Sequence, residues 1–480
     1  MAGSVNATPG FDLQPSSERV ALQTNYITNF DFLNQYLPDT YEKEFERYGN
    51  RTISGFLRMV GAEMPTNSDM IKWAEQGRLH TKYTNCTSAG AAAATTATWR
   101  VNDTLNPGTG SPAIRVGQTV FITDNTTPAT GLTNKAVVTA VDVANNELDF
   151  TVAYYEGGGQ AVATGVDCTV MIYGSEFKKG TEGMSGSLEA DDLIFDNKPI
   201  ILKDRYEVSG SDMAQIGWIE VTTENGATGY LWYMKSEHET RLRFDDYLET
   251  AMIEAVPAAP NSGAEVALSG GTAAVGTVNA GSEGIFYAVE NRGNLWSGGI
   301  PSALADFDAI ISRLDKQGAI EENVLFVNRE MSFDIDDMLA AQNSYGAGGT
   351  SYGLFDNDEQ MALNLGFTGF RRGYDFYKSD WKYLNDPTMR GNLTNGVVNG
   401  LLVPAGSTTV YDQVLGKNAK RPFLHVRYRA SETEDRRYKT WITGSAGGAA
   451  TSSLDAMEVH FLSERAVCVM GANNFFLFKD

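Results

Sequence analysis

Hydrophobic and polar positions follow two different periods along this chain, and the clearest stretch is helical. Between Gly229 and Ala255, apolar side chains recur at intervals of three and four residues, which places them on one stripe of an α-helix. Such a helix would be about 40 Å long, and Pro257 would end it. We expect this stripe to be buried. Its members are Phe244, Tyr247, Leu248, Ala251, Met252 and Ala255.

A polar segment, residues 176–225, precedes the predicted helix and reads as an extended two-armed ribbon. The neighbouring sequence predicts no element that would cover it. A ribbon of this kind usually lies on another chain, so the order of ribbon and long helix indicates a protein that assembles.

Residues 85–175 show strand-like alternation instead of the helical period, and they are rich in Thr, Ala, Gly, Val and Asn. Asn145-Asn146 lies between two alternating stretches, which is a hairpin signal. The pattern predicts a small antiparallel β-barrel or sandwich inserted as a module. The flanking stretches Arg78–Tyr83 and Tyr173–Lys179 are interpreted as the two sides of one interrupted ribbon.

The rest of the chain predicts a mixed α/β domain. A short helix is expected after Asn67 or Ser68, and residues 258–300 are interpreted as a Gly/Ala-rich loop or hairpin excursion. A helix should end at Gly318, followed by a buried strand at residues 324–327 and a second helix. The last segments alternate as strands, and the final one is apolar enough to be central.

Composition narrows the classes of function. The chain has 480 residues and a net charge of −22, which disfavours nucleic-acid binding through bulk electrostatics. Its three cysteines, Cys86, Cys168 and Cys468, have no short spacing, so we expect neither a disulfide framework nor a cysteine zinc site. The low cysteine count favours a reducing compartment. The first residues lack the basic and apolar regions of a signal peptide, and no apolar run is long enough to predict a membrane span.

The search for catalytic chemistry finds little. The four histidines, His80, His238, His425 and His460, have no metal-binding spacing. Ser351 lies in a GxSxG string, but loop-like sequence surrounds it. The acidic pairs are interpreted as structural, with Asp336 and Asp337 expected at the start of a helix. We therefore predict no enzyme, no catalytic residue, no metal and no cofactor.

Two basic doublets are the candidate contact residues. Lys178-Lys179 lies on the ribbon and would suit an ionic contact with an acidic neighbour, and Arg371-Arg372 lies among aromatic residues. We expect these four residues at a subunit interface, although ordinary solvated charge accounts for them equally well.

The order of parts resembles the major capsid proteins of tailed bacteriophages, which have the HK97-type fold. The resemblance implies an α+β class with an N-terminal arm (1–34), the P-domain start and first E-loop strand (35–84), the inserted all-β domain (85–175), the second E-loop strand (176–225), the spine helix and P-domain (226–300), the A-domain (301–467) and a C-terminal strand (468–480). The strings KWAEQGRLHTKYT and ENVLFVNREMSFDIDDML also resemble capsid proteins of crAss-like phages.

What the resemblance implies for function is an icosahedral shell. The chain would self-assemble into hexamers and pentamers, in the host cytoplasm, and become part of the virion. The shell would enclose double-stranded DNA without sequence-specific binding and without a membrane, alongside portal, scaffold or cement proteins. The alternatives are a tail-tube or tail-sheath subunit, or a phage-borne carbohydrate-active enzyme or adhesin.

Overall fold

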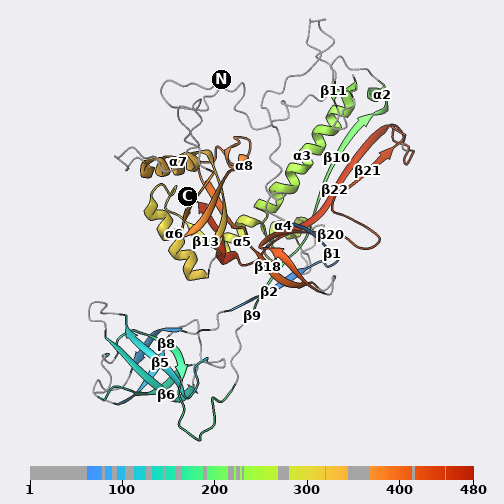
Figure 1. The fold of residues 1–480 in the computed structure, drawn as a ribbon. Coiled ribbons are helices and arrows are strands. Elements are labelled where there is room, and N and C mark those ends of the chain that lie inside the picture. The colour runs from blue at the N-terminus through green and yellow to red at the C-terminus, as the bar shows by residue number, and fades with distance from the viewer. Residues whose placement is uncertain are drawn as a thin grey trace. The chain divides into compact units, whose positions relative to one another are not determined.

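The computed structural model describes most of the chain after residue 61, and it divides into two compact units. The smaller unit is Ala74–Phe195, and the larger unit combines Met1–Trp73 with Asp196–Asp480 (Figure 1). The predicted arm, residues 1–34, lies outside the described residues, as does Ser351. The described residues are 62–77, 80, 82–88, 95–102, 113–125, 132–144, 147–157, 162, 165–186, 192–214, 221–222, 228–229, 232–268, 280–318, 320–343, 368–412, 417–448 and 450–479.

The smaller unit is a closed six-stranded antiparallel barrel. Its alternating pattern fills the interior: in β4, Ala97, Trp99 and Val101 are buried while the residues between them are exposed. The sequence therefore predicted the class of this domain correctly. The structure is a barrel and not a sandwich because the first and last strands pair with each other. In barrel order its strands are β3 (Lys82–Ser88), β4 (Thr96–Val101), β7 (Glu147–Tyr154), β6 (Thr133–Ala144), β5 (Gln118–Asp124) and β8 (Cys168–Ser175).

The predicted hairpin in this barrel is confirmed. Strands β6 and β7 pair antiparallel up to Ala144 and Glu147, so residues 145 and 146 connect them. The expected ribbon flanks lie partly in the barrel, because β3 begins at Lys82, β8 ends at Ser175, and these two strands pair. The strands that pair beyond the barrel are β2 (Ile71–Gln76) and β9 (Asp192–Asn197).

A six-stranded mixed sheet forms the centre of one part of the larger unit. Every residue of β17 is buried, since the sheet is covered on both faces. The last strand, β23, lies between β13 and β17, which confirms the prediction that the final apolar segment is central. In sheet order the strands are β13 (Asn294–Trp296), β23 (Phe476–Lys479), β17 (Val398–Pro404), β14 (Glu322–Val327), β16 (Tyr374–Asp380) and β15 (Gly369–Arg372).

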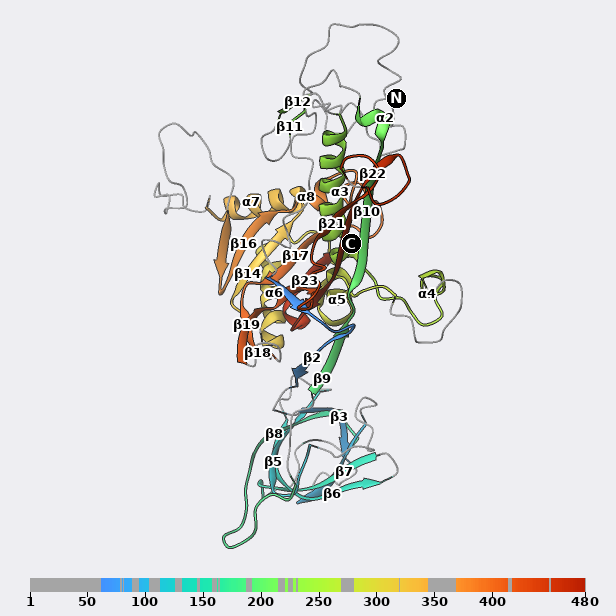
Figure 2. The same cartoon turned by 90° about the vertical axis from the view of Figure 1, so that its right-hand side faces the viewer.

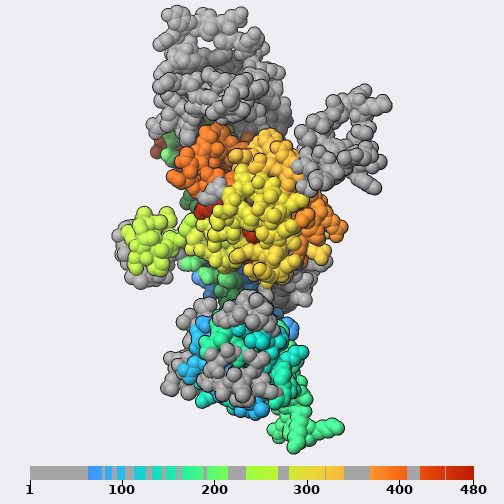
Figure 3. Space-filling model, turned by 90° about the vertical axis from the view of Figure 1, so that its left-hand side faces the viewer, coloured from blue at the N-terminus to red at the C-terminus, as the bar shows by residue number. Residues whose placement is uncertain are grey.

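Helices α6 (Leu304–Gln317) and α7 (Arg329–Asn343) cover one face of this sheet, where Phe307, Ile310 and Leu314 of α6 are buried. Figure 3 views the larger unit from the side that α6, drawn in yellow, covers. As predicted, α6 ends at Gly318, which caps it with a φ of +83°. The opposite face packs against α5 (Ile285–Arg292) and the end of the long helix.

The long helix is α3 (Trp232–Glu254), close to the predicted span. It runs beside β10 and β22 in both ribbon views (Figures 1 and 2). These strands belong to a five-stranded sheet in which β22 is the long central strand. The members of that sheet are β1 (Ala62–Thr66), β20 (Leu424–Arg429), β22 (Ala456–Val469), β10 (Ile200–Ser209) and β21 (Lys439–Gly444).

Several local predictions were wrong. The residues after Ser68 form strand β2 instead of a helix. The stretch 258–300 contains α4 (Gly263–Leu268), α5 and β13 in addition to loop. The remaining short elements are α2 (Gly210–Met213), α8 (Lys382–Asn385), the 3-10 turn Ala472–Asn474, and the pairs β11 (Val221–Thr222) with β12 (Thr228–Gly229) and β18 (Ser407–Asp412) with β19 (Lys417–Pro422).

Candidate functional site

The ribbon expected to lie uncovered is in part a structural strand of this chain. Strand β10 pairs antiparallel with β22 along its whole length, from Ile200 opposite Arg465 to Ser209 opposite Ala456. Because β22 follows more than two hundred residues later in the sequence, local pattern could not predict this cover.

Helix α3 packs on one face of the layer formed by β10, β22 and β21. Phe244 is fully buried, with ring centroids 5.5 Å from Tyr438 and 5.8 Å from Phe461. An ion pair adds to the contact, since Arg243 Nη2 lies 2.9 Å from Asp204 Oδ2. Phe244, Leu248 and Met252 confirm the predicted stripe, whereas Tyr247 is 47% exposed and is not part of it.

The other face of this layer is open. Alternate residues of β10 are exposed along the strand, namely Ile201, Lys203, Arg205 and Glu207. We call the face formed by these side chains, the β22 residues opposite them and Trp441 of β21 the open face. The sequence feature that corresponds to the open face is the stretch IILKDRYEVS, in which successive side chains point to opposite faces of the strand and every second one is exposed.

A polar cluster is built at the centre of the open face. Glu458 Oε1 lies 3.3 Å from Arg205 Nη1, and its Oε2 lies 3.3 Å from His460 Nε2. Thr443 Oγ1 contacts the same His460 nitrogen at 2.7 Å. The Trp441 ring stacks on the imidazole with centroids 5.1 Å apart. The cluster therefore presents an aromatic plate and charges of both signs on one surface.

The C-terminal end of α3 is tied to the six-stranded part of the larger unit. Arg390 Nη2 donates to Glu254 Oε2 at 2.6 Å, and Tyr383 Oη donates to Glu254 Oε1 at 2.5 Å. Burial and then the hydrogen bond to Glu254 raise the pKa of Tyr383, so its hydroxyl keeps its proton and remains a donor. This contact anchors the long helix to the strand-rich core, and the sequence contained no signal for it.

The doublet Arg371-Arg372 has partners within the chain. Arg372 Nη2 lies 2.7 Å from Asp308 Oδ2 of α6, and hydrogen bonding to this guanidinium lowers the pKa of Asp308. Arg371 Nε lies 3.2 Å from Asp375 Oδ1, the residue opposite it in the hairpin of β15 and β16. Their expected role at a subunit interface stays a prediction, and a neighbouring carboxylate would have to compete with these partners.

The doublet Lys178-Lys179 follows β8 in the smaller unit, and both residues are exposed. The Lys178 carbonyl accepts a hydrogen bond from Thr181 Oγ1 at 2.6 Å, which shapes the turn after it. Large apolar side chains are exposed on and near β8 as well: Val116, Tyr155, Met171, Tyr173, Phe177 and Met184. The interface role of the two lysines also stays a prediction.

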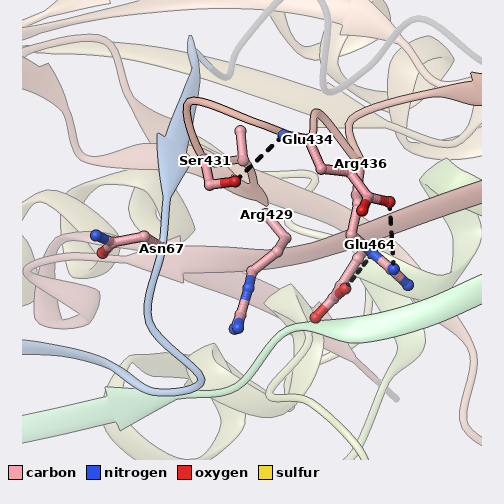
Figure 4. Close-up of a pocket in the computed structure, with 7 residues that line it drawn as sticks. Asn67, Arg429, Ser431, Glu434, Arg436 and Glu464 are labelled. Carbon is pink, nitrogen blue, oxygen red and sulfur yellow. Dashed lines mark hydrogen bonds and ion pairs between the residues drawn. The ribbon is translucent and has the colours of Figure 1, made fainter.

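One cavity, of about 290 Å³, lies beside the β20–β22 edge of the larger unit (Figure 4). Arg429 Nη1 lies 2.5 Å from Asp69 Oδ1, and Arg436 Nε lies 2.6 Å from Glu464 Oε2. Glu434 pairs with Lys439 at 2.8 Å, and this hydrogen bond lowers the Glu434 pKa. The charges around the cavity therefore neutralise one another, and they do not indicate a charged ligand.

The other residues singled out in the sequence have structural surroundings. His425 and His460 lie in strands β20 and β22, as expected. Asp336 lies in the middle of α7, contrary to its predicted place at a helix start, and pairs with Lys378 Nζ at 2.5 Å. Within the described residues, no group of three or more His, Cys, Asp or Glu side chains could hold a metal ion. The described helices are all too short or too polar to cross a membrane.

Comparison with known proteins gives structural matches alone. No protein-family model matches the sequence, and no curated protein matches it. A structure from Microbacterium phage Oxtober96 matches with 9% identity and a TM-score of 0.39, covering 93% of this chain and 97% of that chain. The capsid structure of the cyanophage P-SCSP1u matches with 8% identity and a TM-score of 0.38, covering 97% of this chain and 98% of that chain.

A third match covers less of the chain. The asymmetric unit of the bacteriophage PhiM1 mature capsid has 10% identity and a TM-score of 0.31, covering 64% of this chain and 78% of that chain. We base the functional proposal on the residues and elements of this chain.

Proposed function

We propose that this chain is a major capsid protein of the HK97 type, which associates with copies of itself into the hexamers and pentamers of an icosahedral phage shell. Helix α3 takes the part of the spine helix, and the six-stranded sheet with α6 and α7 takes the part of the A-domain. Strands β2 and β9 with the barrel take the place of an E-loop carrying an insertion. The order of these parts along the chain is the order that the resemblance implies.

The observation that carries the proposal is the open face. Helix α3 packs on β10 and β22 from one face of the β10–β22–β21 layer, and the other face presents Ile201 and Trp441 together with Arg205 and Glu458. Apolar and aromatic side chains surrounded by paired charges are typical of a protein–protein contact. A face with both charge signs can meet a second copy without net repulsion. Among the described strands, β21 pairs with β22 alone, so its other edge can offer backbone groups to a neighbour.

Chemistry favours a structural role over the alternative of a carbohydrate-active enzyme. The cavity of the larger unit is lined by charges that are already paired. Among the described residues that line this cavity, two free carboxylates converging on an open cleft, as a glycosidase requires, are not found, because Glu434 and Glu464 each pair with a cation.

Electron microscopy of the expressed full-length chain tests the proposal. We expect closed shells or capsomer rings, and size-exclusion chromatography should show assemblies much larger than the 52.2 kDa chain. Long tubes would favour the tail-tube or tail-sheath alternative. A chain that remains monomeric at high concentration would contradict self-assembly.

A variant pair tests the open face itself. Trp441→Ala should reduce the yield of assemblies, and its unfolding midpoint is measured in parallel because the Trp441 side chain is 36% exposed and stacks on His460. Tyr377→Ala is a matched control, since Tyr377 is an exposed aromatic residue on a strand of the other sheet. Equal yields of assemblies from both variants would contradict the proposal that the open face is the contact between copies of the chain.

The barrel is proposed as a separable module of the shell subunit, displayed on the outside. Its core consists of its own residues, from Tyr83 to Val170, and its few basic residues make it a poor ligand for packed DNA. We expect that a short Gly/Ser linker from Gln76, the last residue of β2, to Asp192, the first residue of its pairing partner β9, leaves a soluble chain that still assembles. Insoluble product, or intact particles that antibodies against the barrel fail to label, would contradict this proposal.

A further inference from the structure

Two of the three cysteines lie opposite each other in the barrel, although they are far apart in the sequence. Strands β3 and β8 are the first and last strands of the barrel, and their pairing closes it. In that pairing Cys86 is the register partner of Cys168. Both side chains are 0% exposed and belong to the barrel core, so they occupy the same inner face of the same two strands.

A β-bulge creates this juxtaposition. Tyr83 pairs with Val170 and Cys86 with Cys168, so β3 advances three residues where β8 advances two. The extra residue is accommodated at Asn85, whose φ of +55° lies in the left-handed region. Without it, strand alternation would place Tyr83 and Cys86 on opposite faces. With it, both are buried, and Cys86 faces inward opposite Cys168.

We propose that Cys86 and Cys168 form a redox-active pair, which a small-molecule disulfide such as oxidised glutathione converts into an intramolecular disulfide across the closing seam of the barrel. Directly opposed residues of antiparallel strands have Cα atoms about 4.5–5.5 Å apart. A disulfide requires about 4.4–6.8 Å between the same atoms. The backbone register therefore needs no rearrangement to admit the bond.

The reaction proceeds by two thiol–disulfide exchanges. One barrel thiolate attacks the glutathione disulfide, which forms a protein–glutathione disulfide and releases one glutathione thiolate. The second barrel thiolate attacks the protein sulfur of that mixed disulfide, forms the Cys86–Cys168 bond and releases the second glutathione. Two electrons pass from the protein to the reagent, and the two cysteine protons end on the two released thiolates.

Burial makes this reaction depend on opening of the seam. Desolvation, followed by the nearby Asp124 and Asp167, raises the pKa of the Cys168 thiol to about 12. Since the thiolate is the nucleophile, the closed barrel suppresses the reaction. The cysteine pair is the last register pair of β3 with β8. Each cysteine also faces a second neighbouring strand, Cys86 opposite Val101 and Cys168 opposite Asp124, so separation of β3 from β8 at this pair is the opening that exposes both thiols.

Cys468 supplies a matched control within the same chain. It is 1% exposed, and it also lies in a strand. Its register partner in β20 is His425, however. Cys468 therefore resembles the barrel cysteines in its burial and its position in a strand, but it has no second thiol opposite it in that pairing.

The test treats the full chain with oxidised glutathione across a series of sub-denaturing urea concentrations, with alkylation of the remaining thiols. We expect alkylatable thiols to fall from three to one, and the intact mass to fall by two hydrogen atoms. Peptide mapping should give a Cys86–Cys168 link, formed faster as urea rises. The oxidised barrel should unfold on the order of 10 °C higher than the reduced one, because the bond closes a long loop.

Variants complete the test. Cys468→Ser should still form the link, whereas Cys86→Ser and Cys168→Ser should form mixed glutathione disulfides at most. Mapping of the wild-type chain does not depend on whether these variants fold. Glutathione adducts on both barrel cysteines without a link between them, or a link that involves Cys468, would overturn the proposal.

Discussion

Truncation of Phe244 should remove a large part of the contact between α3 and the strand layer. The Phe244 ring is fully buried and contacts both Tyr438 and Phe461. Replacing a buried Phe by Ala costs about 3–5 kcal/mol through lost transfer free energy and the cavity left behind. With its two aromatic neighbours, Phe244→Ala should fall near the middle of this range, about 4 kcal/mol. By contrast, Tyr247→Ala should change the free energy of unfolding by about 0.5 kcal/mol or less.

The assay is urea unfolding of the full chain followed by far-ultraviolet circular dichroism at the helical band. All the described helices lie in the larger unit, so this signal reports the unit that contains Phe244 and is little affected by the barrel. The shift of the midpoint, multiplied by the slope of the transition, gives the change in unfolding free energy. An unchanged slope would show that the comparison is made between the same two states.

The two variants refute the reasoning if their order is reversed or their effects are equal. A loss below about 1 kcal/mol for Phe244→Ala would mean that the ring is not enclosed by Tyr438 and Phe461. A loss of several kcal/mol for Tyr247→Ala would mean that the helix is rotated, so that the originally predicted stripe is buried in full.

Three further changes test other contacts. Tyr154→Phe removes the hydroxyl that accepts from Trp99 Nε1 at 2.9 Å, so the barrel should lose about 1–3 kcal/mol; no change in its thermal midpoint would contradict this. Burial raises the pKa of Tyr154 to about 12, so the stabilisation that comes from burying the neutral phenol should be fully present below pH 10 and be lost as the pH rises through 12, which ultraviolet titration of tyrosinate would follow. Arg390→Ala leaves Glu254 without its cation and should cost about 2 kcal/mol in urea unfolding, whereas a neutral result would show that water replaces the guanidinium. Arg372→Ala, at an exposed pair, should leave the urea midpoint unchanged while nuclear magnetic resonance shows the pKa of its acidic partner on α6 rising, and a large midpoint shift would disprove the surface assignment.

Local sequence determined the elements whose cause is local. Gly318 ends α6 because a left-handed residue is needed there. Residues 145 and 146 connect two strands because each flanking stretch alternates by itself. The long helix and the barrel class could be predicted for the same reason, because apolar residues recur every 3.6 positions in a buried helix face and every 2 positions in a strand.

The period determines which residues share a face, but it does not determine what that face meets. The predicted stripe of α3 was right at Phe244 and Leu248 and wrong at Tyr247, because the true boundary depends on how the helix lies against β10 and β22. The polar ribbon pattern predicts a contact with a second chain, but β22, from the far end of the sequence, pairs with part of the ribbon within this chain.

The candidate surfaces show the same division. The basic doublets were visible in the sequence, whereas the ion pairs that hold Arg371 and Arg372 were not. Cysteine spacing argued against a disulfide, yet a single bulge residue places Cys86 opposite Cys168. Strand register is set by the packing of a whole barrel, which is the sum of many contacts between distant residues. Composition and periodicity therefore determined the kinds of parts in this protein, and only tertiary packing decided which side chains meet.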